Sequence, residues 1–230
     1  MSDESKLPKG METEKTADYS VHEGKGLEMA PPPPSPKLRI FQPSDKRIGE
    51  KDGDFEGAKP GQFFFSGNNH VSDSLEVVPC FFARTFLIQE QTAPKEWNIV
   101  AFEPQRPRNV KWVQGQGLML PSGERVVEDI RVYVAWKDVS GAYQCALMDF
   151  ARTSKAVATE WIKILSTTSI QREDHTRYIP PTYALRFKLT TERRENETQV
   201  WYIWHVGLGP KFIDPSSDLF VFADQTYTLA

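Results

Sequence analysis

An apolar run over residues 75–90, "LEVVPCFFARTFLIQE", constrains the fold more than any other stretch. Side chains of a strand alternate between its two faces, and in this run both faces are apolar. One set is Val78, Cys80, Phe82, Phe86 and Ile88, and the other is Val77, Phe81 and Leu87. Pro79 cannot donate a ladder hydrogen bond. The run therefore predicts a long, bent strand shared between two layers of sheet.

Several shorter segments continue the β pattern. The expected strands are 97–102, 129–138, 142–150, 183–192 and 198–209, with a hairpin-like stretch at 117–128. Only residues 153–165 change to helical spacing, with Val157, Trp161, Ile164 and Leu165 on one face. Strands with a single helix before the last hairpin predict a mainly β fold, namely a small Greek-key barrel of the oligonucleotide-binding (OB) type.

The last predicted strand, 198–209, raises a question about its surroundings. Its sequence, "TQVWYIWHVGLG", places Val200, Tyr202, Trp204 and Val206 on one face and Trp201, Ile203 and His205 on the other. Neither face is strongly polar. One face is expected to pack on the core. The other could be covered by more protein, by a partner chain or by stacked nucleic-acid bases.

Composition divides the chain into three parts. Residues 1–57 are charged and rich in Pro, which predicts a disordered N-terminal arm containing the stiff "PPPPSP" segment at 31–36. The apolar island at 38–43 could dock onto the body as a short strand. Residues 58–210 form the predicted barrel, and residues 211–230 a mildly acidic tail, although its Phe/Val stretch could equally be a last strand.

Several classes of protein are disfavoured by composition and by missing motifs. The formal net charge of −3 shows no bulk basic signature, and there is neither an apolar signal sequence nor an 18-residue apolar run. Cys80 and Cys145 are expected to be buried thiols. No spacing matches a metal site, a phosphate-binding loop or a catalytic motif. We therefore expect no enzymatic activity, no catalytic residues, no cofactor, no metal and no membrane association.

The most informative local feature is the proximity of aromatic and basic residues. Single-stranded nucleic acid is bound by a positive groove that follows the phosphates and by flat rings that stack the bases. The candidates in the loop at 103–117 and in the last hairpin are Arg106, Arg108, Lys111, Trp112, Arg186, Lys188, Arg193, Arg194, Trp201 and Trp204. The alternative for each aromatic residue is a place in the core. For Arg186 and Lys188 it is a solvated strand face.

Five segments carry a resemblance to known proteins: "AKPGQFFFS" (58–66), "EVVPCFFAR" (76–84), "ALMDFARTSKAVATEWIKIL" (146–165), "YALRFKLTTERREN" (183–196) and "WYIWHVGLG" (201–209). They resemble a group of uncharacterised bacteriophage-encoded proteins and, more loosely, phage single-stranded DNA-binding proteins with an OB barrel. That resemblance implies a non-enzymatic coat for DNA replication or recombination intermediates in the host cytoplasm. It also implies a C-terminal tail that recruits replication proteins, and it carries no assigned binding residues.

The residues and the resemblance together predict a single-stranded DNA-binding protein. Binding would use the last hairpin and the loop at 103–117. The alternative is a virion structural or assembly protein, a possible homo-oligomer in which the second apolar face of 198–209 is a subunit interface.

Overall fold

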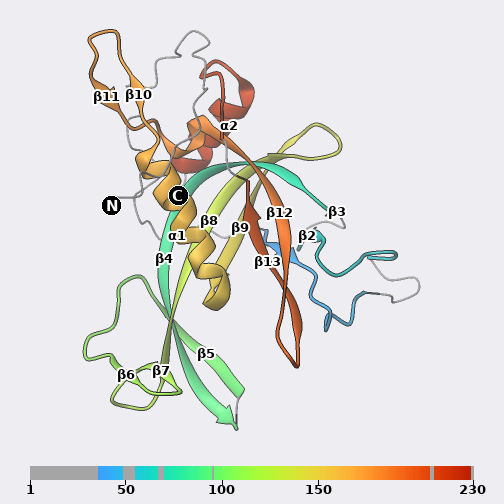
Figure 1. Cartoon of the computed structure of the whole chain (residues 1–230), viewed down its shortest axis with the longest axis vertical. Coiled ribbons are helices and arrows are strands. Elements are labelled where there is room, and N and C mark those ends of the chain that lie inside the picture. The colour runs from blue at the N-terminus through green and yellow to red at the C-terminus, as the bar shows by residue number, and fades with distance from the viewer. Residues whose placement is uncertain (1–35, 49–54, 67–69, 95, 208–209, 229–230) are drawn as a thin grey trace, which may run out of the picture.

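The computed structural model describes residues 36–48, 55–66, 70–94, 96–207 and 210–228. Their fold is mainly β, as predicted, with a curled sheet and two helices (Figure 1). The strands are β1 (Leu38–Ile40), β2 (Phe63–Phe65), β3 (Val71–Ser72), β4 (Leu75–Ala93), β5 (Glu96–Glu103), β6 (Lys111–Val113), β7 (Gly117–Met119), β8 (Arg125–Lys137), β9 (Tyr143–Ala151), β10 (Ile170–Gln171), β11 (Arg177–Tyr178), β12 (Leu185–Glu195), β13 (Val200–Val206) and β14 (Lys211–Phe212). The helices are α1 (Lys155–Thr167) and α2 (Asp218–Thr228), with short 3₁₀ turns η2 (Arg152–Ser154) and η3 (Thr182–Ala184).

Two long strands, β4 and β8, run side by side through the whole main sheet (Figure 1). At one end they are flanked by β12 and β13 on one side and by β9 on the other. At the other end β5 pairs with β4, and β7 and β6 continue beyond β8. The register shifts between Pro79 and Phe81, where the proline cannot donate to the ladder. The predicted long first strand is confirmed, and this irregularity accompanies its curvature.

The barrel end has the predicted connectivity. The order β13-β12-β4-β8-β9, with α1 between β9 and β12 in the chain, is that of a five-stranded Greek-key barrel with its helix after the third strand. Trp161 of α1 is fully buried, and the rings of Phe82, Phe150 and Phe187 meet it edge-on. The helix thus fills the inside of the curled sheet.

The N-terminal sheet β1–β2–β3 fills the seam between β9 and β13, which do not pair with each other in the described part of the chain. On the β9 side, Lys37 bridges to Leu147, whose N–H donates to the Pro36 carbonyl at 2.8 Å. On the β13 side, the Gln42 side chain accepts from the Tyr202 N–H at 2.9 Å and donates to its carbonyl at 3.0 Å. Residues 36–42 therefore take the place of a closing strand.

This arrangement corrects the predicted domain boundary at residue 58. Leu38 and Phe41 are buried, and β1 pairs along its length with β2, so the body begins no later than residue 36. The apolar island at 38–43 does dock as a short strand. The rest of the predicted arm, residues 1–35 and 49–54, lies outside the described residues.

The C-terminal segment was also predicted wrongly, because it is folded rather than a tail. β14 pairs with β12, and α2 is a second helix where the sequence predicted only one. Phe220, Ala223 and Tyr227 are at helical spacing and pack on the sheet face opposite α1. The Tyr183 hydroxyl donates to Asp224 at 2.6 Å. Neither helix of the described residues is long and apolar enough to cross a membrane.

Candidate nucleic-acid interface

The ten predicted binding residues fall into two groups at opposite edges of the main sheet. Residues 106–112 belong to the connection between β4 and β8, which also contains β5, β6 and β7. Residues 186–204 belong to the β12–β13 hairpin. Since β13 and β6 are the two ends of the strand order, the structure does not bring the groups together. Each group therefore has to be judged as a separate surface.

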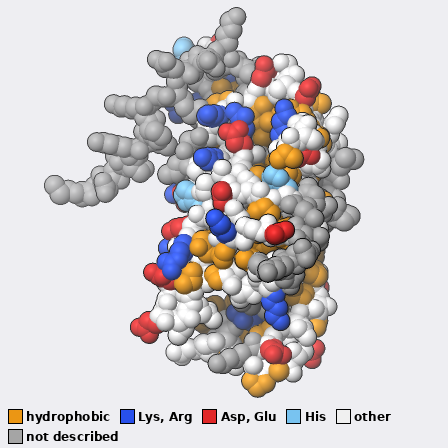
Figure 2. Space-filling model, turned by 90° about the vertical axis from the view of Figure 1, so that its right-hand side faces the viewer, with side chains coloured by type: hydrophobic (Ala, Val, Ile, Leu, Met, Phe, Trp, Pro, Cys, Tyr) orange, Lys and Arg blue, Asp and Glu red, His pale blue; other side chains and the backbone are white. Residues whose placement is uncertain are grey.

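The arginines of the β12–β13 hairpin are held by carboxylates. Arg193 pairs with Glu195 at 2.7 Å and Arg194 with Glu192 at 2.9 Å, while Arg186 reaches Glu76 of β4 at 3.0 Å. Lys188 is exposed, but it lies opposite Glu76 in the register. Basic and acidic side chains are interspersed over the face shown in Figure 2. The hairpin offers phosphates little uncompensated positive charge.

Trp204 is a core residue, which overturns its prediction as a base-stacking ring. It is 5% exposed, its ring stacks on Phe63 with centroids 5.4 Å apart, and its indole N–H donates to the Asp149 carbonyl at 3.3 Å. The partner ring comes from β2, in a part of the chain far from β13. Protein from the N-terminal sheet therefore covers this face of β13 around Trp204.

On the other face of β13, Trp201 is half-buried, Ile203 is buried and His205 is exposed. Trp201 lies opposite Arg194 in the register. Its indole nitrogen is buried without a hydrogen-bond partner among the described residues. This ring keeps only part of its surface for a ligand.

The loop group has the opposite character. Arg106, Arg108 and Lys111 are exposed, and none has a carboxylate partner within the described part of the chain. Trp112, in the short edge strand β6, is 74% exposed. An uncompensated cationic loop next to a projecting ring has the two components that stacking and phosphate contact require.

Four further residues of the same connection and of β8 were missed by sequence reasoning. Phe102 in β5 is 55% exposed, with the Arg131 guanidinium 5.0 Å from its ring centroid. Trp97, also in β5, has Arg125 at 5.7 Å. The apolar sequence "WNIVAF" suggested an ordinary short strand. Its exposure depends on β5 being an edge strand that pairs only with β4 in the described part of the chain.

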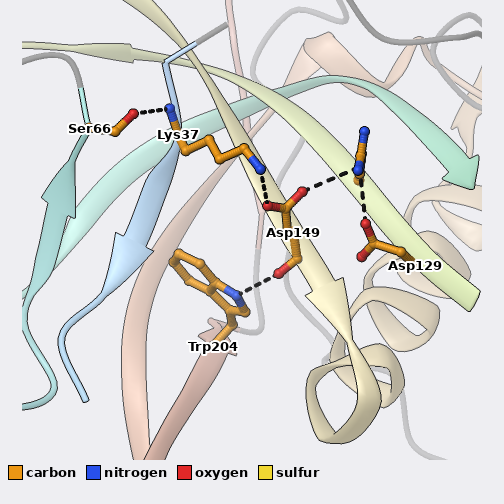
Figure 3. Close-up of polar contacts among 6 residues, drawn as sticks. Lys37, Ser66, Asp129, Asp149 and Trp204 are labelled. Atoms are coloured by element: carbon orange, nitrogen blue, oxygen red, sulfur yellow. Dashed lines mark hydrogen bonds and ion pairs between the residues drawn. The ribbon is translucent and has the colours of Figure 1, made fainter. Parts of the chain in front are cut away.

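An ionic network lies where β1, β8 and β9 meet (Figure 3). The Lys37 ammonium pairs with Asp149 at 3.0 Å, and Arg131 contacts Asp129 at 3.0 Å and Asp149 at 3.4 Å. Burial, and then the Asp149 carboxylate, raise the pKa of Asp129, although Arg131 opposes this. The network fastens β1 to the seam. Within the described part of the chain, no three His, Cys, Asp or Glu residues are grouped so that they could hold a metal ion.

The two cysteines lie in neighbouring parts of the main sheet. Cys80 is buried in β4 and Cys145 is half-buried in β9. The sequence predicted both in apolar strands, and Cys80 packs in the cluster under α2. They belong to the packing of that face rather than to the exposed loop.

Comparison with known proteins gives a family. No curated protein and no solved structure matches the chain. A family model described as Pam3 phage gp34-like protein matches residues 17–230, which include all the elements of the fold described above. The chain therefore belongs to the Pam3 phage gp34-like protein family.

Proposed function

We propose that this protein binds single-stranded DNA without acting as an enzyme, in phage DNA replication or recombination. The binding surface is the connection between β4 and β8, centred on Trp112 and the loop before it. The β12–β13 hairpin, which the sequence placed at the centre of the interface, contributes less because its arginines are already paired with carboxylates.

The observation that carries this proposal is the exposure of Trp112 beside unpaired cations. A soluble fold gains nothing from leaving an indole 74% exposed, and an aromatic face stacks on any base. Lys111 precedes it, and Arg106 and Arg108 lie a few residues earlier in the same loop. These three cations can follow a phosphate backbone while the ring engages a base.

The connectivity supports the same surface. In OB barrels, oligonucleotides bind to the loop between the first and second strands and to the loop between the fourth and fifth. Here those connections are the β4–β8 insertion and the β12–β13 turn. Membership of a phage family is consistent with a role on phage DNA.

Intrinsic tryptophan fluorescence tests the proposal directly. A single-stranded oligonucleotide should quench the emission of the wild type, because a base stacked on an indole quenches it. The Trp112→Phe variant should lose most of that quenching while it still binds in a gel shift. Trp204→Phe, at the buried ring, is the matched control and should keep the quenching. If micromolar protein at low salt neither quenches nor shifts any oligonucleotide, the proposal is wrong.

A virion structural or assembly role is the second candidate, and one observation favours it. Ile99 and Val100 of β5 are exposed at one edge of the sheet and Val113 of β6 at the other, and exposed apolar edge residues of this kind also suit a subunit interface. In that case light scattering would show an oligomer that Val100→Asp dissociates, without any binding of oligonucleotides. A monomer that binds oligonucleotides would exclude this candidate.

A further inference from the structure

The outer face of the main sheet, opposite α1, continues from the region under α2 onto β5. Strand register places Leu87 beside Phe102 and Val127, and Gln89 beside Ile99 and Arg125. Thr85 lies opposite Asp129. Paired residues share a face, so these side chains form one patch, which we call the β4–β5–β8 face. Trp112 pairs with Leu118, which pairs with Val126, and so belongs to the other side of the sheet.

Three buried polar side chains on the β4–β5–β8 face have atoms without partners. Thr85 and Gln89 are each 6% exposed and Asp129 is 2% exposed. In the described structure, no hydrogen bond reaches Thr85 Oγ1, Gln89 Oε1 or Asp129 Oδ1. Leaving a buried acceptor unsatisfied is costly, and natural proteins rarely do so without a functional reason. The unsatisfied oxygen of Gln89 indicates that a hydrogen-bond donor from outside the chain completes it.

The rim of the same patch is aromatic and cationic. Phe102 is half exposed and lies beside Leu87, between Thr85 and Gln89 along β4. The Arg131 guanidinium lies over its ring in a cation–π contact, and the Arg125 guanidinium lies over the Trp97 ring in the same way. Arg125 faces Gln89 in the register and has no carboxylate partner among the described residues. A rearrangement of its long side chain, of the kind common at interfaces, would open the way to Gln89.

We propose that the β4–β5–β8 face is a subsite for one amino-bearing nucleobase of a bound single strand. The base stacks on Phe102, and its exocyclic amino group donates to Gln89 Oε1. This inference rests on the proposed function and deepens it, because it names the bases preferred. Adenine and cytosine present an amino group on the Watson–Crick edge, whereas uracil and thymine present a carbonyl oxygen there, which cannot donate a hydrogen bond to Gln89 Oε1.

Two homopolymers give a test that needs no variant. Oligo(dC) and oligo(dU) are both pyrimidine strands, and their Watson–Crick edges differ in the 4-amino and 4-oxo groups. The wild type should bind oligo(dC) roughly three- to tenfold more tightly than oligo(dU), the effect of one net hydrogen bond. Equal affinities, or tighter binding of oligo(dU), would overturn the subsite while leaving single-stranded DNA binding intact. No binding of either strand would instead reject both proposals.

Single substitutions then show which residues cause the preference for oligo(dC) over oligo(dU). Gln89→Leu should bring the oligo(dC) affinity down to that for oligo(dU). Phe102→Ala should weaken the binding of both oligonucleotides, and Phe102→Tyr should restore it. Val139→Ala, at an exposed turn between β8 and β9, is the matched control and should change neither affinity. If Gln89→Leu fails to fold, the comparison of Phe102→Ala with Phe102→Tyr tests the subsite. Unchanged oligo(dC) affinity in Phe102→Ala, or a preference that survives in folded Gln89→Leu, contradicts the proposal.

Discussion

The side chain of Gln42 forms two hydrogen bonds with the backbone of Tyr202, a residue 160 positions later in the chain. This amide imitates the pair of bonds that a neighbouring strand would make with β13. It satisfies an N–H and a carbonyl on the side of β13 that no described strand covers. On the edge of β13 away from β12, the backbone hydrogen bonds of Tyr202 are therefore made by one side chain near the N-terminus, that of Gln42.

Replacing that side chain should loosen the seam. Gln42→Ala leaves both backbone groups of Tyr202 without partners in a partly buried place, so we expect the free energy of unfolding to fall by about 1–3 kcal/mol. Urea denaturation measures the change. Gln144→Ala, which removes an exposed bond to Asp138, is the control and should stay within about 0.5 kcal/mol of the wild type. An equal effect of the two substitutions would show that the Gln42 bonds do not hold the seam.

Trp161 should be the most costly tryptophan to remove. It is fully buried among the rings inside the curled sheet, so Trp161→Ala should lower the free energy of unfolding by about 3–5 kcal/mol. Trp161→Phe should cost less, because it keeps a ring there and removes an indole nitrogen that has no partner in the described structure. Trp112→Ala, at the exposed edge strand, should leave the melting temperature almost unchanged. An unaltered melting temperature in Trp161→Ala would mean that α1 does not pack as described.

The salt dependence of DNA binding should be governed by the loop cations. Each phosphate contact adds about 0.7 to the slope of log K against log salt concentration for a single strand. The wild type should have a slope of about 2. A single substitution should reduce it by about the amount of one contact, whether Arg106→Gln, Arg108→Gln or Lys111→Gln. The control is the double variant Arg193→Gln/Glu195→Gln, which removes an ion pair without changing net charge. If the double variant changed the slope more than the loop variants did, the DNA interface would lie on the β12–β13 hairpin instead.

Asp129 should make the protein less stable as pH rises. Its pKa is raised in the folded state, so the protonated form is favoured by folding. That contribution is complete below the ordinary aspartate pKa and is lost as pH rises through the raised one. Asp129→Asn cannot ionise and keeps an acceptor for Arg131. Relative to the wild type, the variant should therefore gain stability in urea titrations as pH rises above the ordinary aspartate pKa.

An aspartate with the opposite shift provides the control. Hydrogen bonds from Thr176 lower the pKa of the exposed Asp174. Its contribution is present above the ordinary aspartate pKa and is lost as pH falls. Asp174→Asn should therefore be less stable than the wild type above the ordinary aspartate pKa, by a difference that shrinks as pH falls, whereas Asp129→Asn should be more stable than the wild type there. The same sign in both variants would contradict the assignment.

Local patterns in the sequence were enough to predict most of the barrel. Clean alternation identified β12, short apolar runs identified β8, β9 and β13, and helical spacing identified α1. The pairing of the hairpin arginines could also have been read, because residues two apart in a strand share a face. Glu192 with Arg194, and Arg193 with Glu195, are such pairs. The sequence thus already contained a reason to rank the hairpin below the loop.

The remaining features depend on distant parts of the chain. Trp201 and Trp204 could not be distinguished, since both faces of β13 are apolar and the covering ring of Phe63 comes from another sheet. The exposure of Phe102 follows from the edge position of β5, which a local pattern does not reveal. Helix α2 was missed because its apolar stripe is short and could equally have been a strand.

The seam also determines when the barrel can close during synthesis. Contacts between residues so far apart in sequence form late, since they carry a large entropic cost of chain closure. At about 5–20 residues per second, the ribosome needs roughly 10–30 s to add the residues between Gln42 and Tyr202. Phe41 and Phe64 can stack on each other during that interval, but Phe63 has to wait for Trp204. A nascent chain stalled before residue 200 would present an open β12 edge and an uncovered aromatic face to other unfinished chains.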